Sequence, residues 1–379
     1  MLIPIAKPII DEAEIQAVRE VLESGMLAEG EVSRKLEREF ASYIGVKHAS
    51  VATNGTAALI TALEAMDIEP GDEVITSPFT FIASANSIAL VGGVPIFVDI
   101  DPTTYNLDPR LIEDAITERT KAIMPVHIFG MPCNMREIMA IAEDYDLMVI
   151  EDACQAHGAR IDGKQVGTFG DISAFSFYAT KNMMTGEGGM IVTDNEDLMD
   201  RVLMIKNHGR GKEGGYSHYR IGYNHRMMDL VSAIGREQLK RLPEIVKSRR
   251  KNAELYDEIF SQFSEITPQH EPEGFESAYH VYAPRLESEK LTRDEMIAEL
   301  RDAEVGSRSV YALPCHLQGT YQRIDEWRWA EYVTYPDYSS LELPHSVAVG
   351  DDHFEVPVHP GVKESDIDHI EDVIEEALS

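Results

Sequence analysis

Lys181 is the residue whose setting most favours chemistry. It stands in FSFYATKNMMTGEGG, residues 175–189, a segment that strand-favouring apolar residues lead into and a glycine-rich turn ends. A lysine held in such a loop away from water loses affinity for its proton, so its amine could attack a carbonyl group. Most lysines are ordinary surface residues, and the reason to single out Lys181 must come from the rest of the chain.

A possible phosphate site lies at residues 53–57, TNGTA. Gly55 would let a ligand approach the backbone closely, and the helix predicted after it would direct free N–H groups and a positive dipole end at an anion. Thr56 adds a hydroxyl group. The same residues are also what an ordinary capped helix start requires, because Asn and Thr are good N-caps.

Two acids, Glu151 and Asp152, directly follow the apolar run 147–150, which predicts a strand. In open α/β sheets ligands bind beyond the carboxyl ends of the strands, and alternation would turn one of the acids toward such a site. Asp152 could hold a positively charged ring nitrogen, with an interaction of at most about 4 kcal/mol at ~4 Å. Gln155 could hydrogen-bond the same ligand. The acid could instead simply cap a helix or end the strand.

An aromatic ring and a hydroxyl group complete the set. Ser176 lies five residues before Lys181 and could donate to a phosphate, and Phe79 or Phe81 could stack on a planar ring. Core packing explains Phe79 equally well. A phosphate cradle, a strand-end aspartate, an aromatic ring and a desolvated lysine together suit pyridoxal 5′-phosphate: the lysine forms a Schiff base, and the ring, protonated opposite the aspartate, acts as an electron sink.

Alternating strands and helices must position these residues. Short apolar runs predict strands at 48–52, 73–76, 95–100, 122–126 and 147–150, and amphipathic or capped segments predict helices at 11–24, 31–44, 57–66, 80–90, from 108 onward, and at 134–145. This alternation is typical of an α/β fold whose mainly parallel sheet is covered by helices on both faces.

The regular alternation of short strands and helices ends after residue 227. Helical sequence runs to about residue 260 with an interruption expected near Pro243; strands at 279–284 and 356–358 and helices at 292–303 and 365–378 follow, the former with a Thr292/Glu295 capping box. We therefore expect a large domain, residues 1–245, and a smaller C-terminal α+β domain, residues 246–379. The first twenty or so residues could pack with either domain.

Composition narrows the class of protein. The 379 residues are 44% hydrophobic and 26% charged, as in ordinary soluble globular proteins, and no run is long and apolar enough to span a membrane. The formal net charge of -32 argues against binding to nucleic acid or to an anionic membrane surface. This charge indicates either a well-solvated acidic surface or adaptation to a salty cytoplasm.

The cysteines and histidines indicate no metal site. Three widely separated cysteines, without metal-ligand spacing, fit the reducing cytoplasm, and the start of the chain lacks the features of a signal peptide. His127, His157 and His208 are expected to be packed or solvent-facing residues, since no pair has metal-ligand spacing on a helix.

The chain resembles a known family, the DegT/StrS-type nucleotide-sugar aminotransferases, which are fold-type I pyridoxal-phosphate enzymes. The resemblance covers nearly the whole chain. It rests on NGTAAL (54–59), GDEVITSPFTFIASAN (71–86), VDIDPTTYNLD (98–108), IEDACQAHGA (150–159), GTFGDISAFSFYATKNMMTGEGG (167–189) and GYNHRMMDLVSAIG (222–235).

The resemblance implies a role for each matching residue. Lys181 would carry the cofactor and then shuttle the proton, Asp152 would pair with the pyridinium nitrogen, and Gln155 would contact the ring hydroxyl. Gly55, Thr56 and Ser176 would bind the phosphate, and Phe81 rather than Phe79 would stack on the ring. Asn224 would reach the phosphate from a neighbouring subunit, and Arg226 would be available for an anionic donor or substrate group. Tyr311 and His316 would line the sugar-nucleotide side.

The implied protein is a cytoplasmic homodimer with active sites shared across its interface. It would move an amino group from glutamate to a nucleotide-linked keto sugar, by analogy a 4-keto-6-deoxy hexose, in amino-sugar synthesis for a surface polysaccharide, a glycan or a secondary metabolite. Because Lys181 is present where the family's sugar 3-dehydratases carry histidine, transamination is favoured. A sugar dehydratase, a cyclitol aminotransferase and a non-catalytic regulatory protein are the alternatives. Tyr178 stands where histidine is frequent, which bears on local packing.

Overall fold

A seven-stranded sheet forms the centre of the computed structural model, which describes residues 2–211 and 215–379. The strand order is β1-β9-β8-β5-β4-β2-β3; β1, β9 and β8 pair antiparallel, and the pairs from β8 to β3 are parallel. The strands are β1 His48–Ala52, β2 Glu73–Thr76, β3 Val94–Phe97, β4 Thr120–Met124, β5 Met148–Asp152, β8 Ile172–Ser176 and β9 Gly189–Thr193. The prediction of a mainly parallel sheet is confirmed.

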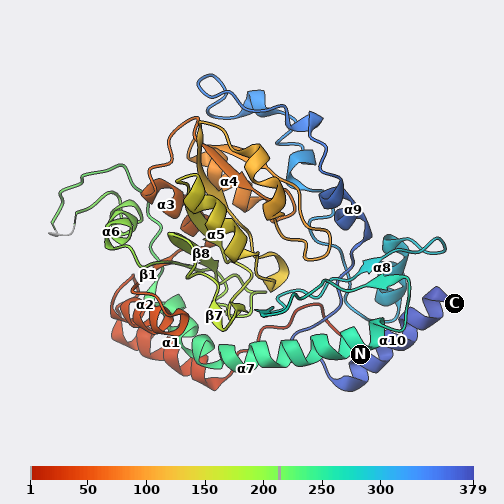
Figure 1. Ribbon diagram of the computed structural model, residues 1–379. Helices are drawn as coiled ribbons and strands as arrows, with labels where there is room; N and C mark the ends of the chain where they lie inside the picture. The colour runs from red at the N-terminus through yellow and green to blue at the C-terminus, as the bar shows by residue number, and fades with distance from the viewer. Residues whose placement is uncertain (1, 212–214) are drawn as a thin grey trace.

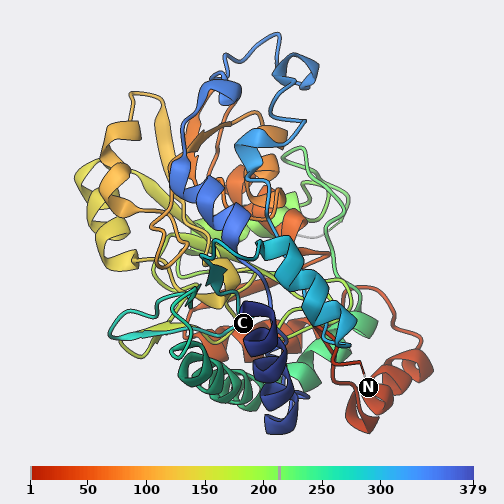
Figure 2. The ribbon, with the colours of Figure 1, turned by 90° about the vertical axis from the view of Figure 1, so that its right-hand side faces the viewer.

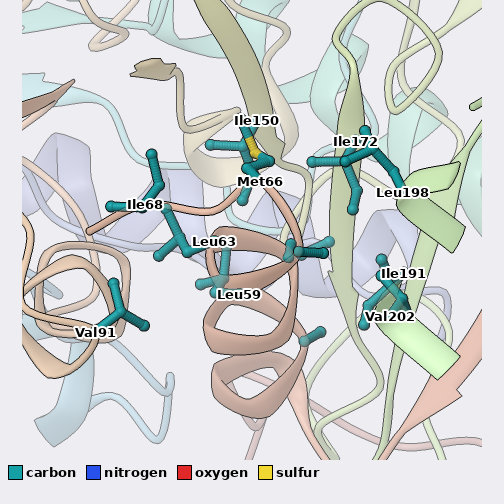
Figure 3. Close-up of a cluster of buried hydrophobic side chains, with 14 of the residues drawn as sticks. Leu59, Leu63, Met66, Ile68, Val91, Ile150, Ile172, Ile191, Leu198 and Val202 are labelled. Atoms are coloured by element: carbon teal, nitrogen blue, oxygen red, sulfur yellow. The ribbon is translucent and has the colours of Figure 1, made fainter. Parts of the chain in front are cut away.

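Helices cover both faces of this sheet (Figure 1). They are α2 Glu31–Ile44, α3 Gly55–Ala65, α4 Ala83–Leu90, α5 Met135–Asp144, α6 Glu196–Ile205 and α7 Asp229–Phe260. Helix α1, Glu12–Ser24, packs on α7 instead. Helices α3, α4 and α6 pack on one face, and α2, α5 and α7 pack on the other. Figure 3 shows why α3 lies where it does: its Leu59 and Leu63, and Met66 directly after its end, pack against the sheet residues Ile150, Ile172 and Ile191.

Several predicted elements differ in extent. The helix expected at 80–90 begins at Ala83, and the helix expected after Asp108 is two 3₁₀ turns, Pro109–Leu111 and Glu113–Ala115, although Asp108 caps the first of them as expected. The prediction of strands at 279–284 and 356–358 is wrong: these two segments meet only at one isolated bridge, between Tyr282 and Val356. Their alternating apolar residues serve core packing rather than a ladder.

Helix α7 corrects another expectation, because it continues through Pro243 without interruption (Figure 1). A proline inside a helix removes one backbone hydrogen bond and costs about 3 kcal/mol. Burial on both sides of the proline offsets this cost: Leu239 and Leu242 pack under the sheet, and Tyr256 and Phe260 pack in a second core.

That second core belongs to the smaller C-terminal part, which Figure 2 turns toward the viewer. It combines the end of α7 with α8 Arg293–Asp302, α10 Glu364–Leu378 and the strand pair β10 Ile266–Thr267 and β12 Arg285–Leu286. The Thr292/Glu295 capping box of α8 is confirmed. Ile3 joins this core and pairs with Val305, whereas α1 packs on α7.

The described residues also form α9 Pro344–Asp352 and a three-stranded sheet of β6 Arg160–Ile161, β7 Lys164–Gln165 and β11 Phe275–Glu276. Four further 3₁₀ turns are Ile128–Gly130, Cys315–Leu317, Ile324–Glu326 and Tyr338–Ser340. The division of the chain near residue 245 stays a proposal, since that residue lies inside α7. Across the described ranges, no helix combines the length and the apolar character that crossing a membrane requires.

Candidate active site

A cavity of about 980 Å³ opens where the carboxyl ends of β5 and β8 meet the start of α3. Parallel strands β5 and β8 run side by side, so the residues that end them reach the same edge of the sheet. Eight of the predicted site residues line this cavity: Gly55, Thr56, Phe81, Asp152, Gln155, Ser176, Lys181 and Tyr311.

The start of α3 forms an anion cradle in one wall. Asn54 caps the helix by accepting a hydrogen bond of 2.8 Å from the N–H of Ala57. Gly55 is required by a close approach: a Cβ atom there would lie 2.7 Å from the Cβ of Ser176. Strand β8 therefore brings the Ser176 hydroxyl against the free N–H groups and the positive dipole end of α3, an arrangement that suits a phosphate.

Asp152, at the end of β5, supplies a buried negative charge, being only 3% exposed. Its carboxylate oxygens accept hydrogen bonds from the hydroxyl of Ser84, at 2.7 Å, and from the N–H of Cys154, at 3.1 Å. These two bonds fix the orientation of the carboxylate. Within residues 2–211 and 215–379 no Lys, Arg or His pairs with Asp152, so its charge is available to a cationic ligand atom.

Gln155 and Tyr311 form the wall beside it. The Gln155 side chain accepts from the N–H of Phe129 at 3.0 Å and donates to the Tyr311 hydroxyl at 3.4 Å. Tyr311, whose φ is 61°, stacks on Phe129, and burial raises the pKa of its hydroxyl. Phe81 is 56% exposed at the cavity, whereas Phe79 is fully buried among other rings.

Lys181 enters the cavity from the turn after β8. The N–H of Lys181 donates to the carbonyl of Tyr178, which closes the turn, and the Nζ lies 3.4 Å from the Nε2 of His280. Burial lowers the pKa of Lys181, while Cys154 and Asp152 act in the opposite direction. A lysine with lowered proton affinity can act as a nucleophile toward a carbonyl and as a proton carrier.

Three predicted residues do not line the cavity. Asn224 is exposed and accepts a hydrogen bond from Arg226, which also donates to Asn207; only their neighbour His225 reaches the cavity. His316 is buried beside Phe97. The roles predicted for these three residues stay predictions.

Sequence reasoning missed other residues of the cavity. Ser84 holds Asp152, His280 contacts Lys181, and Arg308 brings a second cationic side chain to the wall. Ser84 lies in a predicted helix after a strand, a place where a ligand-facing hydroxyl is common. His280 and Arg308 lie in irregular segments far along the chain, and no spacing points to them.

The three histidines that the sequence predicts to be packed or solvent-facing residues lie in such places. His127 is buried with its Nε2 3.0 Å from Glu151, His157 is buried against Phe175 and Phe177, and His208 is exposed. Burial lowers the pKa of His157 to about 3.

The residues present fit pyridoxal 5′-phosphate. The glycine cradle suits the phosphate, Asp152 suits the ring nitrogen, and Lys181 suits the aldehyde. Few other cofactors would use a buried unpaired carboxylate, an anion-binding helix start and a desolvated lysine at once.

Comparison with known proteins supports this chemistry. The spore coat polysaccharide biosynthesis protein SpsC of Bacillus subtilis is 40% identical over 98% of this chain and 95% of its own. A GDP-perosamine synthase of Caulobacter vibrioides is 37% identical over 99% of this chain and 98% of its own. The structure of a putative sugar aminotransferase, Spr1654 of Streptococcus pneumoniae, in its pyridoxal-phosphate form matches with a TM-score of 0.88 and 28% identity, covering 100% of both chains.

The family model for these enzymes matches residues 8–375, nearly the whole chain. The family model and these relatives confirm the resemblance and the prediction of an aminotransferase, and the solved structures confirm the fold class and the cofactor pyridoxal phosphate. The chain belongs to the DegT/DnrJ/EryC1/StrS aminotransferase family.

Proposed function

We propose that this enzyme transfers the amino group of glutamate to a nucleotide-linked keto sugar, with a 4-keto-6-deoxy hexose as the first candidate. One observation carries the proposal: Lys181, with its lowered pKa, shares a cavity with the unpaired Asp152 carboxylate and the start of α3. The relatives named GDP-perosamine synthase support a sugar nucleotide as acceptor. Three free cysteines support action in the cytoplasm.

Each residue has a task in this reaction. When bound, pyridoxal phosphate supplies the electron sink that allows a proton to leave the substrate carbon. Lys181 takes that proton on its Nζ and returns it at the neighbouring position, as a general base and then a general acid. Asp152 keeps a positive ring nitrogen charged, and Ser84 holds the carboxylate in place. Gly55, Thr56 and Ser176 anchor the phosphate.

The cavity also suits an anionic donor. Lys181 is engaged in the chemistry, which leaves Arg308 as the other Lys or Arg side chain that lines the cavity in the part of the chain described. Its Nε lies 3.3 Å from Glu355, and its side chain is 45% exposed. Arg308 can therefore turn part of its guanidinium toward a carboxylate of glutamate. We propose that Arg226 binds an anionic group together with Asn224, in the active site of the neighbouring subunit and not in the cavity of its own chain.

A panel of keto-sugar nucleotides with glutamate tests the proposed activity. Mass spectrometry should find an amino sugar and 2-oxoglutarate in equal amounts, and Lys181→Ala should abolish steady turnover. Near-normal turnover in Lys181→Ala would exclude the assignment. A deoxy keto sugar without added nitrogen would identify the enzyme as a dehydratase.

We also propose a homodimer with shared sites, because Asn224 is exposed and does not line the cavity of its own chain. Lys181→Ala and Asn224→Ala can be prepared separately and mixed under conditions of subunit exchange. In a mixed dimer one site regains both native residues, so about a quarter of all sites should recover at equal mixing. No recovery, with exchange verified by mass spectrometry, would exclude the shared site.

A further inference from the structure

His280 lies within hydrogen-bond distance of the reactive amine, yet no sequence motif points to it. Its Nε2 lies 3.4 Å from the Nζ of Lys181, and both side chains line the cavity. The other ring nitrogen, Nδ1, is buried without a hydrogen-bond partner in the part of the chain described. The Nε2 contact is therefore the hydrogen bond that the imidazole makes.

The backbone around His280 is held unusually firmly. Tyr279, the preceding residue, has a φ of 42°, a conformation that non-glycine residues rarely adopt. The guanidinium of Arg249, from α7, donates to the carbonyls of Tyr279, at 2.9 Å, and His280, at 3.1 Å. Gly130 approaches so closely that a Cβ atom there would lie 2.9 Å from the backbone nitrogen of His280.

The lysine side of the contact is tied to the same segment. Asn182, the residue after Lys181, donates from its side chain to the carbonyl of Ala278 at 2.8 Å. Ala278 in turn donates to the carbonyl of Gly130 at 2.9 Å. The turn that carries Lys181 and the turn that carries His280 are thus joined to each other, so the contact between the two side chains follows from the fold.

The charges around His280 decide which proton arrangement is possible. Lys181, Arg249, His157 and Arg308 surround it, and burial together with these groups holds its pKa well below the ordinary value. The imidazole is therefore neutral, and in the tautomer that carries its proton on Nδ1 its Nε2 can accept a hydrogen bond from a protonated Lys181. Around Lys181, Cys154 and Asp152 also favour the charged form, while burial opposes it.

We propose that His280 is a positioning residue for Lys181: its Nε2 accepts a hydrogen bond from the Lys181 amine whenever that amine is free. This inference rests on the proposed aminotransferase function. The free lysine must keep a proton that it can return to the substrate carbon, although its dry surroundings favour losing it. A neutral acceptor at Nε2 keeps that proton available without adding a charge.

Labelling of the cofactor-free protein tests the proposal without measuring activity. Formaldehyde with a borane reductant methylates neutral amines, and mass spectrometry of the Lys181 peptide across pH 6–10 gives a midpoint. In His280→Leu the ammonium loses its acceptor, so the midpoint should fall by about half a unit to one unit. His280→Gln retains an acceptor oxygen and should restore most of the shift. Exposed Lys35 serves as an internal reference.

His157→Asn is the matched control, because His157 is also a buried imidazole near Lys181 but makes no hydrogen bond to it. Its midpoint should stay near that of the unaltered protein. Equal midpoints for His280→Leu and the unaltered protein, or for His280→Leu and His280→Gln, would overturn the proposal. Borohydride reduction of the loaded enzyme, which should attach the cofactor to Lys181, tests the proposed function separately.

Discussion

Gly55→Ala is the substitution whose effect follows most directly from the structure. The new Cβ would lie 2.7 Å from the Cβ of Ser176 and 3.1 Å from both the Cys154 Sγ and the Ser176 Oγ. Carbon atoms in contact prefer separations of about 3.5–4.0 Å, so the start of α3 must move away from β8 by about 0.8 Å. The Ser176 Cβ is fixed to a buried strand and cannot turn aside.

This displacement should weaken cofactor binding more than it weakens folding. Overpacking of this kind costs about 1–3 kcal/mol of stability. The larger consequence is that N–H groups of α3 no longer meet the phosphate together with the Ser176 hydroxyl, and a hydrogen bond to a charged group is worth about 1.5–3 kcal/mol. The dissociation constant for pyridoxal 5′-phosphate should therefore rise about 10- to 100-fold.

Titration of the cofactor-free protein with pyridoxal 5′-phosphate, followed by absorbance, measures this constant. Gly319→Ala is the control, since a Cβ atom there meets only a side-chain nitrogen at 3.7 Å. Ser176→Gly removes the obstructing Cβ, so adding Gly55→Ala to Ser176→Gly should cost little more than Ser176→Gly alone. An unchanged dissociation constant in Gly55→Ala, or fully additive losses in the double variant, would refute the steric argument.

Three further predictions concern single groups and the whole surface. Ser84→Ala leaves a buried oxygen of Asp152 without its hydrogen bond. The free energy of unfolding measured in urea should therefore fall by about 1–3 kcal/mol, and cofactor binding should weaken. Ser87→Ala is the control, because Ser87 does not contact Asp152, and it should bind the cofactor normally. Burial raises the pKa of Glu355 to about 7, so the folded protein binds this proton more tightly than the unfolded chain. Stability from that proton is present below pH 4.5 and is lost as pH rises toward 7; Glu355→Gln should flatten this fall in unfolding midpoints measured from pH 5 to 8. The net charge of -32 predicts a melting temperature that rises between low salt and ~1 M KCl, where the screening length is about 3 Å, and a constant melting temperature would contradict adaptation to a salty cytoplasm.

The sequence predicts one wall of the cavity well, and the reason is local. Asp152 ends β5 and Lys181 follows β8, and these two strands pair parallel. The glycine start of α3 follows β1, which runs in the same direction as β8 because two antiparallel pairs join them through β9, so all three reach one edge of the sheet. The preference for Phe81 over Phe79 at the cavity came from the resemblance, and Phe79 proved to be core.

The opposite wall could not be predicted in the same way. His280 and Arg308 reach the cavity from irregular segments, 99 and 127 residues after Lys181, whose conformation depends on tertiary contacts such as the clamp from Arg249. Pro243 misled the sequence reading for a related reason. The local cost of a proline is visible in the sequence, whereas the two cores that keep α7 continuous are visible only after folding.

The continuity of α7 connects these two walls. Leu239 and Leu242 fix the helix beneath the strands that end in the catalytic turn, and Arg249, on the same helix, clamps the carbonyl of His280. Ten residues of helix separate Leu239 from Arg249, about 15 Å of rigid backbone. A break at Pro243 would free Arg249 to move relative to the sheet and would loosen the contact between His280 and Lys181. The continuous helix therefore fixes the position of His280, the proposed neutral acceptor, relative to Lys181, which follows the strand β8 of the main sheet.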